Sequence, residues 1–186
     1  METKIWFTSD THFGGERTLK LSKRPFQTVE EMDRVLINNW NSLVNEDDIV
    51  YHLGDFGDYT TAEKLNGYIN LITGNYERFE ILKVRENAKR FNMVYRDKCD
   101  CWIEYRKEGE INNYHLSMSH EPSIIKEDPI SSDHINLFGH IHKLCMVKPY
   151  GLNVGTDCHN FCPINLETVL FYHVGILDFY DYEVFE

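Results

Sequence analysis

Seven side chains that can bind metal ions recur in short motifs between residues 10 and 142 of the sequence. They are two carboxylates, one amide and four imidazoles: Asp10, His12, Asp55, Asn75, His120, His140 and His142. Mixed oxygen and nitrogen ligands without thiolate suit divalent cations such as manganese, iron, zinc or nickel. Two such cations that share a carboxylate can activate a water and orient a phosphate ester. The residue types therefore predict metal-assisted hydrolysis of a phosphate ester.

The spacing of these residues suggests how they are shared. Side chains two residues apart at the end of a strand lie on the same side of the backbone, so Asp10 and His12 are expected to bind one cation together. His140 and His142 have the same spacing. Asp55 follows a glycine, which lets the backbone approach closely, and its two carboxylate oxygens make it the expected bridge between two cations.

Three apolar runs rich in β-forming residues end directly before ligand motifs, at residues 5–9, 49–53 and 68–72. Such runs predict buried strands. Ligands of open α/β sheets gather outside the carboxyl ends of the strands, so we expect the three strand ends to meet at one site. The helices between them imply right-handed parallel crossovers.

Two capping boxes mark these helices. Thr28 opens a pattern of apolar residues at helical spacing over residues 29–44, which should place one face on the sheet. Thr60 opens a second, shorter helix, which we expect Gly67 to end in a left-handed conformation.

The second half of the chain has a different pattern. Residues 100–105 and 113–119 predict an antiparallel hairpin around a polar turn at 107–110, and residues 135–138 predict a strand that leads to His140. Asn165 can cap a helix that runs to about residue 175. Residues 178–186 alternate acidic and aromatic side chains, which suit a terminal strand, a packed tail or a contact with a partner.

Composition limits the class of protein. A chain of 186 residues with 42% hydrophobic residues is expected to form one domain, over residues 1–186. No apolar run approaches the roughly 18 residues that a membrane span needs, and the N-terminus does not resemble a signal peptide, so we expect a cytoplasmic protein with five free cysteines. A net charge of −11 disfavours non-specific binding of nucleic acid and favours a small phosphate ester as substrate. Nothing in the sequence specifies the oligomeric state.

The ordered motifs resemble those of the calcineurin-like metallophosphoesterases. That family is marked by D-x-H, G-D-x-x-D, G-N-H-[DE], a lone histidine and G-H-x-H. The corresponding residues here are Asp10-Thr11-His12, Gly54-Asp55-Phe56-Gly57-Asp58, Gly74-Asn75-Tyr76-Glu77, His120 and Gly139-His140-Ile141-His142. The context of residues 8–14 is similar to the small bacterial and phage branch. The resemblance implies an α/β fold, a four-layer α-β-β-α sandwich with two mixed β-sheets.

The resemblance also implies how the seven ligands divide. One cation is bound by Asp10, His12 and His142, the other by Asn75, His120 and His140, and Asp55 bridges them. Manganese is the expected cation, and Asp55, Asn75, Tyr76 and His120 are the expected catalytic residues. The implied activity is hydrolysis of phosphodiesters or small nucleotide-like esters by a hydroxide that the two cations activate. A phosphomonoesterase and a non-catalytic metal-binding scaffold remain alternatives.

Tyr76 departs from the family, which has at this position a histidine that hydrogen-bonds the substrate and protonates the leaving group. A tyrosine can still donate a hydrogen bond at neutral pH, so we expect the activity to be weakened, or limited to esters with good leaving groups, rather than abolished. A second departure is Gly15, where relatives often have histidine.

Three groups of residues are candidates for contacts around the ligands. With Asn75, Arg78 is a candidate phosphate contact because guanidinium matches phosphate geometry, and Arg17 and Arg24 are weaker candidates. His159, in a loop that the family brings near the pocket, is a further candidate contact. Asp58 is expected either to orient a ligand histidine or to be a loop acid, and His52 is expected to pack.

Overall fold

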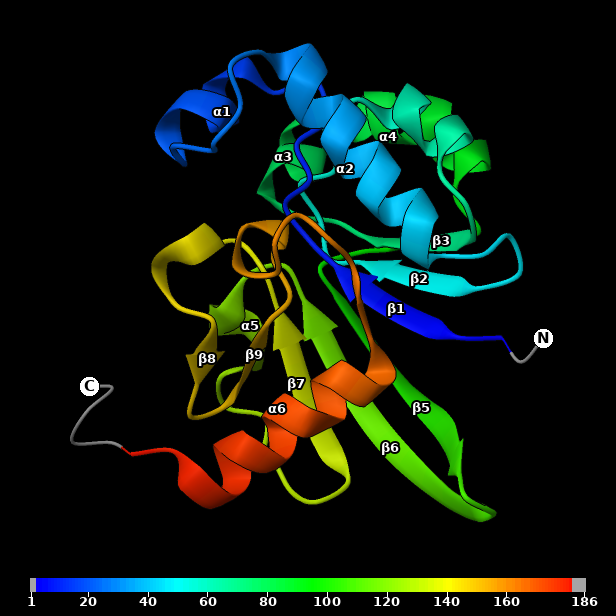
Figure 1. Ribbon diagram of the computed structural model, residues 1–186, viewed down its shortest axis with the longest axis vertical. Coiled ribbons are helices and arrows are strands. Elements are labelled where there is room, and N and C mark those ends of the chain that lie inside the picture. The colour runs from blue at the N-terminus through cyan, green and yellow to red at the C-terminus, as the bar shows by residue number, and fades with distance from the viewer. Residues whose placement is uncertain (1–2, 182–186) are drawn as a thin grey trace.

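Two five-stranded sheets form the centre of residues 3–181, the part of the chain that the computed structural model describes (Figure 1). The first sheet has the order β10-β1-β2-β3-β4. Its strands are β1 (Ile5–Thr8), β2 (Ile49–His52), β3 (Tyr68–Ile72), β4 (Met93–Tyr95) and β10 (Ile164–Asn165). Strands β1 to β4 are parallel, and β10 pairs antiparallel with β1.

The second sheet has the order β5-β6-β7-β9-β8. Its strands are β5 (Lys98–Lys107), β6 (Glu110–Ser119), β7 (His134–Phe138), β8 (Val147–Lys148) and β9 (Gly151–Asn153). The pairs β5–β6 and β8–β9 are antiparallel, whereas β7 lies parallel to both β6 and β9. Both sheets are therefore mixed, and the expected α/β fold class is confirmed.

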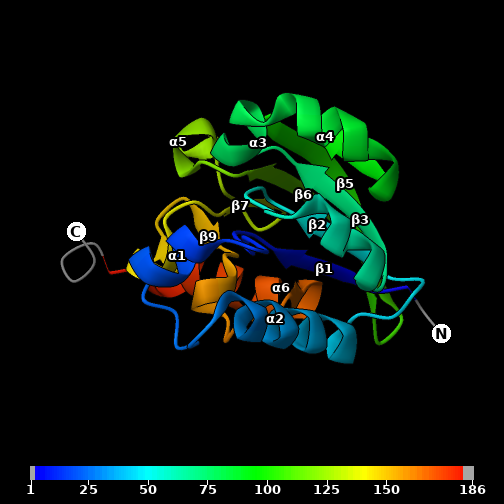
Figure 2. The same ribbon diagram turned by 90° about the horizontal axis from the view of Figure 1, so that it is seen from above.

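The helices lie around the two sheets. They are α1 (Glu16–Leu21), α2 (Val29–Leu43), α3 (Asn75–Phe79), α4 (Ile81–Asn87), α5 (Pro122–Ile125) and α6 (Leu166–Phe179), with the 3₁₀ turns η1 (Tyr59–Lys64), η2 (Ala88–Arg90), η3 (His142–Leu144) and η4 (Thr156–Cys158). In Figure 1, α2, α3 and α4 lie above β1–β3 and α6 crosses in front of the second sheet, while Figure 2 shows α5 on the side away from α6. Among the described helices, none combines the length and apolarity that crossing a bilayer requires.

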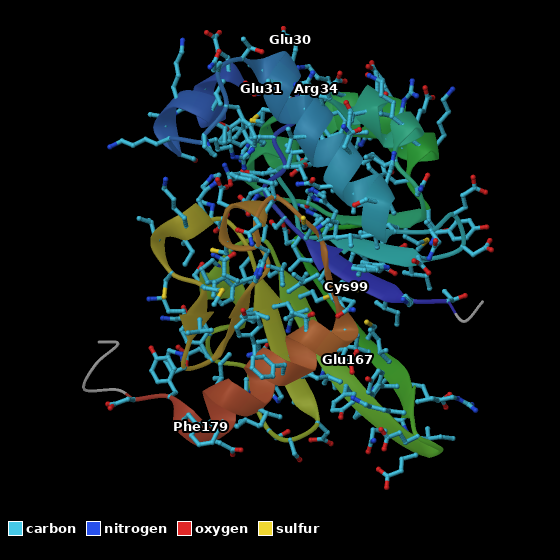
Figure 3. The ribbon with its side chains drawn as sticks, viewed as in Figure 1. Glu30, Glu31, Arg34, Cys99, Glu167 and Phe179 are labelled. Atoms are coloured by element: carbon cyan, nitrogen blue, oxygen red, sulfur yellow. The ribbon has the colours of Figure 1, made fainter. Side chains whose placement is uncertain are left out.

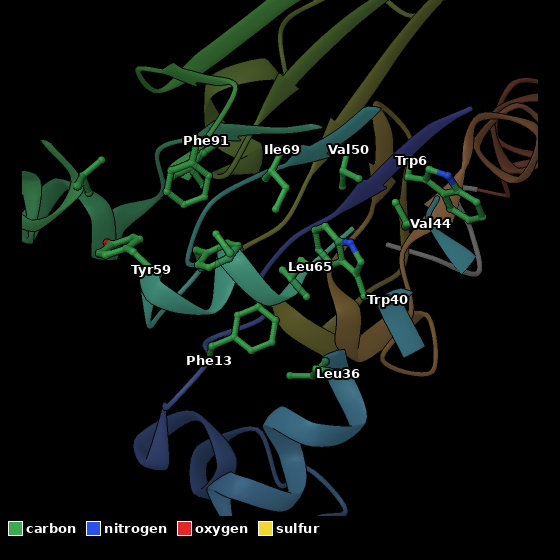
Figure 4. Packing of buried hydrophobic residues seen from close by; sticks show 14 of the residues in the cluster. Trp6, Phe13, Leu36, Trp40, Val44, Val50, Tyr59, Leu65, Ile69 and Phe91 are labelled. Atoms are coloured by element: carbon green, nitrogen blue, oxygen red, sulfur yellow. The ribbon is translucent and has the colours of Figure 1, made fainter. Parts of the chain in front are cut away.

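Helix α2 forms where its capping box predicts. The Thr28 side chain accepts a hydrogen bond from the backbone N–H of Glu31, and the buried stripe of Met32, Leu36 and Trp40 faces the first sheet. The polar face of the helix points outward, as Figure 3 shows at its N-terminal end. Figure 4 shows Trp40 with Val50 of β2 and Ile69 of β3 in the cluster that packs helices on this sheet.

A second apolar cluster joins the two sheets. It contains Phe7 of β1, Leu116 of β6 and Leu137 of β7, together with Val169 and Ile176 of α6. On the opposite face of the second sheet, the Asn136 side chain donates to the backbone carbonyl of Ile125 in α5. The sheets are therefore held to each other and to their helices by two separate cores.

Some predicted elements were wrong in their ends or type. The element predicted from Thr60 is a 3₁₀ turn that begins at Tyr59 and is capped by Asp58, and it ends before Gly67. Gly67, at φ +89°, instead lies in the turn before β3. Helix α6 passes through Gly175, where an added Cβ would meet open space, and ends at Phe179.

Other elements were longer than predicted or were missed. The hairpin strands β5 and β6 extend to a two-residue turn at Glu108 and Gly109, both with positive φ. Strand β4 and helices α3 and α4 were not predicted. The final stretch begins in α6, and its residues 182–186 lie outside the described part of the chain.

Candidate metal centre

The seven predicted ligands converge at the carboxyl ends of strands from both sheets. They follow β1 (Asp10, His12), β2 (Asp55), β3 (Asn75), β6 (His120) and β7 (His140, His142). The described residues contain two groups of side chains that are close enough to share a cation: Asp10, His12 and His142, and Asp10, Asp55 and His120. Asp10 thus belongs to both groups.

The first group surrounds one oxygen of Asp10. Asp10 Oδ1 lies 3.9 Å from His12 Nε2 and 3.9 Å from His142 Nε2. Metal bonds of about 2.0–2.2 Å require ligand atoms within about 4.4 Å of one another. These three residues therefore fit one cation.

His120 of the second group lies next to two further candidate ligands, Asn75 and His140. Its Nε2 lies 2.9 Å from Asn75 Oδ1, 3.2 Å from His140 Nδ1 and 3.4 Å from Asp55 Oδ2. Asp55 Oδ2 also lies 3.6 Å from His12 Nε2 of the first group. The Asp55 carboxylate thus lies close to histidines of both groups.

Two buried atoms of the first group, Asp10 Oδ1 and His12 Nε2, have no hydrogen-bond partner among the described residues. Buried polar atoms are nearly always paired, and a cation would satisfy both. The backbone N–H of His140 donates to Asp10 Oδ2, and His120 Nδ1 donates to the carbonyl of Leu53. These bonds hold the remaining oxygen and nitrogen toward the centre, so the donor set fits divalent metal.

Two of the histidines differ in how readily they bind a proton. Burial lowers the pKa of His12 to about 4. Burial also opposes the protonation of His120, but the carboxylates of Asp10 and Asp55 outweigh it and raise the pKa of His120 to about 9. The centre therefore gathers negative charge that attracts a cation.

The ligand segments have unusual backbone conformations. Five of the seven ligands have positive φ: Asp10 (58°), His12 (48°), Asp55 (56°), His140 (71°) and His142 (48°). This region is uncommon for residues other than glycine, and such residues cluster at functional sites. The N–H of Asp10 donates to the carbonyl of Gly54, and that of His12 to the carbonyl of Asp55. Asp10 and His12 thus meet through left-handed turns that tertiary hydrogen bonds hold, rather than through the strand geometry that the spacing suggested.

Glu77 fixes the loops that carry Asp55 and Asn75. Its buried carboxylate accepts hydrogen bonds from the N–H groups of Asp55 (2.8 Å), Phe56 (2.9 Å) and Gly74 (2.8 Å). Burial raises its pKa, and the charge of Asp55 raises it further. A Cβ on Gly74 would lie 2.5 Å from Asp55 Oδ1, so only glycine allows these loops to approach.

Arg24 and Asp157 support His142 from behind. Arg24, a candidate phosphate contact, is instead buried and donates to both oxygens of Asp157, at 2.9 and 2.8 Å. Burial opposes the charge of Asp157, but hydrogen bonds from His142 and Arg24 outweigh it and lower its pKa to about 2. Sequence reasoning missed Asp157, because nothing in its local sequence distinguishes it from an ordinary loop acid.

Two cavities open beside the centre, with volumes of about 410 and 340 Å³. His12, Arg17, Thr18 and Tyr76 line both of them. The Tyr76 ring stands edge-on to His12, with ring centres 4.9 Å apart, and its backbone N–H donates to Asp55 Oδ1. Tyr76 and Arg17 are therefore next to the ligands.

Two predicted substrate contacts lie elsewhere. The Arg78 guanidinium pairs with Glu121 and lies 3.6 Å from Asp97, and Arg78 lines neither of the two cavities. His159 Nε2 donates to the carbonyl of Asn153 at 2.7 Å, and His159 lines neither cavity. Both assignments stay predictions that no contact among the described residues supports.

Two other residues have local roles. The Asp58 side chain accepts from the N–H and hydroxyl of Thr60, so it acts as a helix cap. His52 is buried against Trp40 and Phe56, and its Nε2 lies 2.9 Å from the hydroxyl of Thr11. His52 thus packs, as expected, and also supports the segment between Asp10 and His12.

The family model of the calcineurin-like phosphoesterases matches residues 3–146. The chain belongs to this family. Calcineurin-like phosphoesterases use divalent metals to hydrolyse phosphoesters, and the clustered side chains are candidate ligands for them. The chain is therefore a metallophosphoesterase, a hydrolase, in agreement with the resemblance of its motifs.

Two of three similar proteins match most of this metallophosphoesterase. The uncharacterized protein MJ1445 of Methanocaldococcus jannaschii is 31% identical over 175 residues, which cover 90% of this chain and 89% of the relative. The gene 66 protein of Mycobacterium phage L5 is 36% identical over 84 residues, 40% of each chain. The crystal structure of a protein of unknown function, AQ665 from Aquifex aeolicus, has a TM-score of 0.64 at 22% identity and covers 90% of this chain and 98% of its own. The last similarity concerns the fold alone.

Proposed function

We propose that the chain is a single-domain cytoplasmic phosphodiesterase that hydrolyses phosphodiesters or small nucleotide-like phosphate esters with two manganese ions. The observation that carries this proposal is the convergence of seven candidate ligands. Two of their buried atoms, Asp10 Oδ1 and His12 Nε2, have no hydrogen-bond partner among the described residues. A chain that only maintained a fold would gain nothing from leaving these atoms unpaired.

In this proposal Asp10, His12 and His142 would hold one cation, Asn75, His120 and His140 would hold the other, and Asp55 would bind both. Such a cation pair supplies hydroxide at neutral pH and offsets the negative charge on the phosphate oxygens. The imidazoles must be neutral to act as ligands, so a bound cation would replace the proton on His120. The hydrogen bond from His120 Nδ1 to the Leu53 carbonyl leaves Nε2 as the nitrogen that faces the other ligands.

The chain's own residues complete the reaction. The oxygen of a water forms a bond to phosphorus and loses a proton, one ester P–O bond breaks, and the leaving alkoxide gains a proton, so that the products are a phosphate monoester and an alcohol. Tyr76 is the proposed donor to the leaving oxygen, supported by its contact with His12 and its presence in both cavities. Arg17 is the proposed phosphate contact, because it lines both cavities and forms no ion pair with the other described residues.

The two cavities favour a diester over a monoester. They meet at the residues beside the centre and then diverge, one toward η1 and α4 and the other toward the ends of α1 and η3. A phosphodiester has two substituents that could enter them, whereas a monoester has one.

A protein-binding role is the alternative that one surface favours. The outer face of α6 exposes Phe171 (76%), Val174 (53%) and Phe179 (79%), and Figure 3 shows Phe179 at the end of the helix. Exposed apolar groups of this kind occur at interaction surfaces. Asp55→Asn separates the two roles, because a scaffold would keep its partner and a hydrolase would lose its activity.

The experiment is manganese-dependent hydrolysis of bis(p-nitrophenyl) phosphate, with Asp55→Asn as the control. Turnover by the wild-type chain that is lost in Asp55→Asn would support the proposal. Metal-loaded wild-type protein that shows no turnover would contradict it. Metal content is measured for both proteins, so that a loss of activity is related to a loss of metal.

A further inference from the structure

We propose that Leu21 and Leu144 form an apolar subsite beside the metal centre, which selects phosphodiesters that carry an apolar alcohol on one arm. The inference rests on the proposed phosphodiesterase function, since it names the kind of substrate for that centre. Alkyl and aryl alcohols both fit this description, because both place apolar surface next to the phosphate.

The subsite belongs to the cavity of about 340 Å³. Five of the seven candidate ligands line this cavity: His12, Asp55, Asn75, His140 and His142. Leu21 and Leu144 line it too, and they are 68% and 85% exposed. Leucines this exposed at the mouth of a cavity have no packing role in the fold, but they can cover an apolar part of a ligand.

Two distant segments form the subsite. Leu21 is the last residue of α1. Leu144 lies more than 120 residues later in the sequence and is the last residue of η3, which follows β7. The Ser22 hydroxyl lies 3.3 Å from His142 Nδ1, so a polar contact joins the end of α1 to the start of η3. Figure 1 shows α1 above the yellow turn that contains η3. The two leucines are thus held beside the ligand His142 and beside each other's segments.

Positive charge lies at the same mouth. Arg17 and Lys143 line this cavity, and neither forms an ion pair within the described part of the chain. In a chain with a net charge of −11, two positively charged side chains beside the metal ligands favour the binding of an anionic group there. The cavity therefore combines a phosphate environment with an apolar mouth.

The other cavity has a different lining. Beyond the shared residues its lining includes the polar side chains of Asp58, Thr60, Lys83 and Asn87, together with the buried Phe13 and Tyr59. An apolar substituent would leave these groups unsatisfied, whereas a hydroxylated arm could bond to them. The contrast assigns the apolar arm to the leucines.

Binding of alkylphosphonates tests the subsite without requiring turnover. Methylphosphonate and hexylphosphonate share one headgroup and differ by five methylenes. Each fully buried methylene strengthens binding by roughly fourfold, and the open mouth buries them only in part, so we expect hexylphosphonate to bind about tenfold tighter. Calorimetric titration of manganese-loaded protein measures the ratio of the two dissociation constants.

The double variant Leu21→Asn, Leu144→Asn should bring that ratio close to one. The matched control is Leu82→Asn on α4, where a leucine is 69% exposed but lines neither cavity, and this control should keep the tenfold ratio. A ratio near one in the wild type, or the same ratio in the wild type and the double variant, would overturn the subsite. Failure of both phosphonates to bind would overturn it as well.

Hydrolysis of methyl p-nitrophenyl phosphate distinguishes the two proposals. If the chain-length preference appears and no ester is hydrolysed, the proposed phosphodiesterase function fails and the apolar subsite stands. If the ester is hydrolysed and both phosphonates bind equally, the function stands and the subsite fails.

Discussion

Asp157 Oδ2 lies 2.7 Å from Nδ1 of His142, and the same carboxylate accepts two hydrogen bonds from the buried guanidinium of Arg24. Arg24 also donates to the backbone carbonyls of Asp10 and Thr11. The pair therefore fixes the His142 ring and the Asp10 segment together. Because Nδ1 donates to the carboxylate, Nε2 keeps its lone pair toward the ligand group.

Asp157→Asn should weaken manganese binding by roughly 10- to 100-fold, because loss of such a supporting carboxylate loosens the ligand ring and lowers its basicity. Titration of the metal-free protein with manganese measures the affinity, and circular dichroism checks the fold. The control is Asp47→Asn, an exposed carboxylate. Equal affinities in the variant and the wild type would show that His142 does not depend on Asp157.

Arg17→Ala should lower kcat/KM for a phosphodiester by roughly 10- to 100-fold, since a hydrogen bond to a charged group is worth about 1.5–3 kcal/mol. The matched variant is Arg78→Ala, whose guanidinium is occupied by Glu121 and Asp97 and which should change kcat/KM little. Steady-state kinetics of both variants decides between them. A large loss in Arg78→Ala together with a small loss in Arg17→Ala would restore Arg78 as the phosphate contact.

The parts of the fold that could be predicted from the sequence are those that local patterns determine. The capping box at Thr28 and the apolar spacing of α2 involve residues within a few turns, and the strands before Asp10 and Asp55 are short apolar runs. The same reasoning misplaced the cap of η1, because Asp58 and Thr60 are both good capping residues and only tertiary packing selects between them.

The parts of the site that could not be predicted depend on long-range contacts. Arg24 and Asp157 are 133 residues apart, and no periodicity relates them. The positive φ angles of Asp10 and His12 are held by hydrogen bonds from their N–H groups to carbonyls in the loop after β2. The motifs thus identified which residues gather, while their conformations and supporting contacts needed the structure.

Glu77→Gln should lower the free energy of unfolding by about 3 kcal/mol. The buried Glu77 carboxylate accepts from three N–H groups, and an amide would present its own donors to some of them and leave those groups unpaired. Urea unfolding measures the change, with the exposed Glu86→Gln on α4 as the control. If Glu77→Gln lowers the free energy of unfolding by no more than Glu86→Gln does, the three hydrogen bonds contribute little.

Tyr76→Phe should slow esters with poor leaving groups more than those with good ones. A proton donor helps a leaving alkoxide, and general acid catalysis is worth roughly 10²- to 10⁴-fold when it is needed. A series of methyl aryl phosphates with leaving groups of increasing pKa measures the dependence of kcat on leaving-group basicity, which should become steeper in the variant. The same proportional loss across the series would mean that the Tyr76 hydroxyl binds substrate without donating its proton.

Asp48 lies at the end of the first sheet away from the metal centre, and it should make the free energy of unfolding depend on pH. Its buried carboxylate accepts from the N–H groups of Lys4 and Asn45 and from the indole of Trp6. Burial alone would raise the pKa of Asp48, but these hydrogen bonds outweigh it and lower the pKa below the ordinary value of 3.8.

Because the folded pKa is lowered, the contribution of Asp48 is present above about pH 4 and is lost as the pH falls through the folded value. Asp48→Asn should therefore be less stable than the wild type at pH 7, by about 2 kcal/mol, and the difference should shrink below pH 4. Urea unfolding at pH 7, 5, 4 and 3 measures it, with the neighbouring exposed Glu46→Gln as the control. A difference that stays constant from pH 7 to pH 3 would show that the charge of Asp48 is not what stabilises this loop.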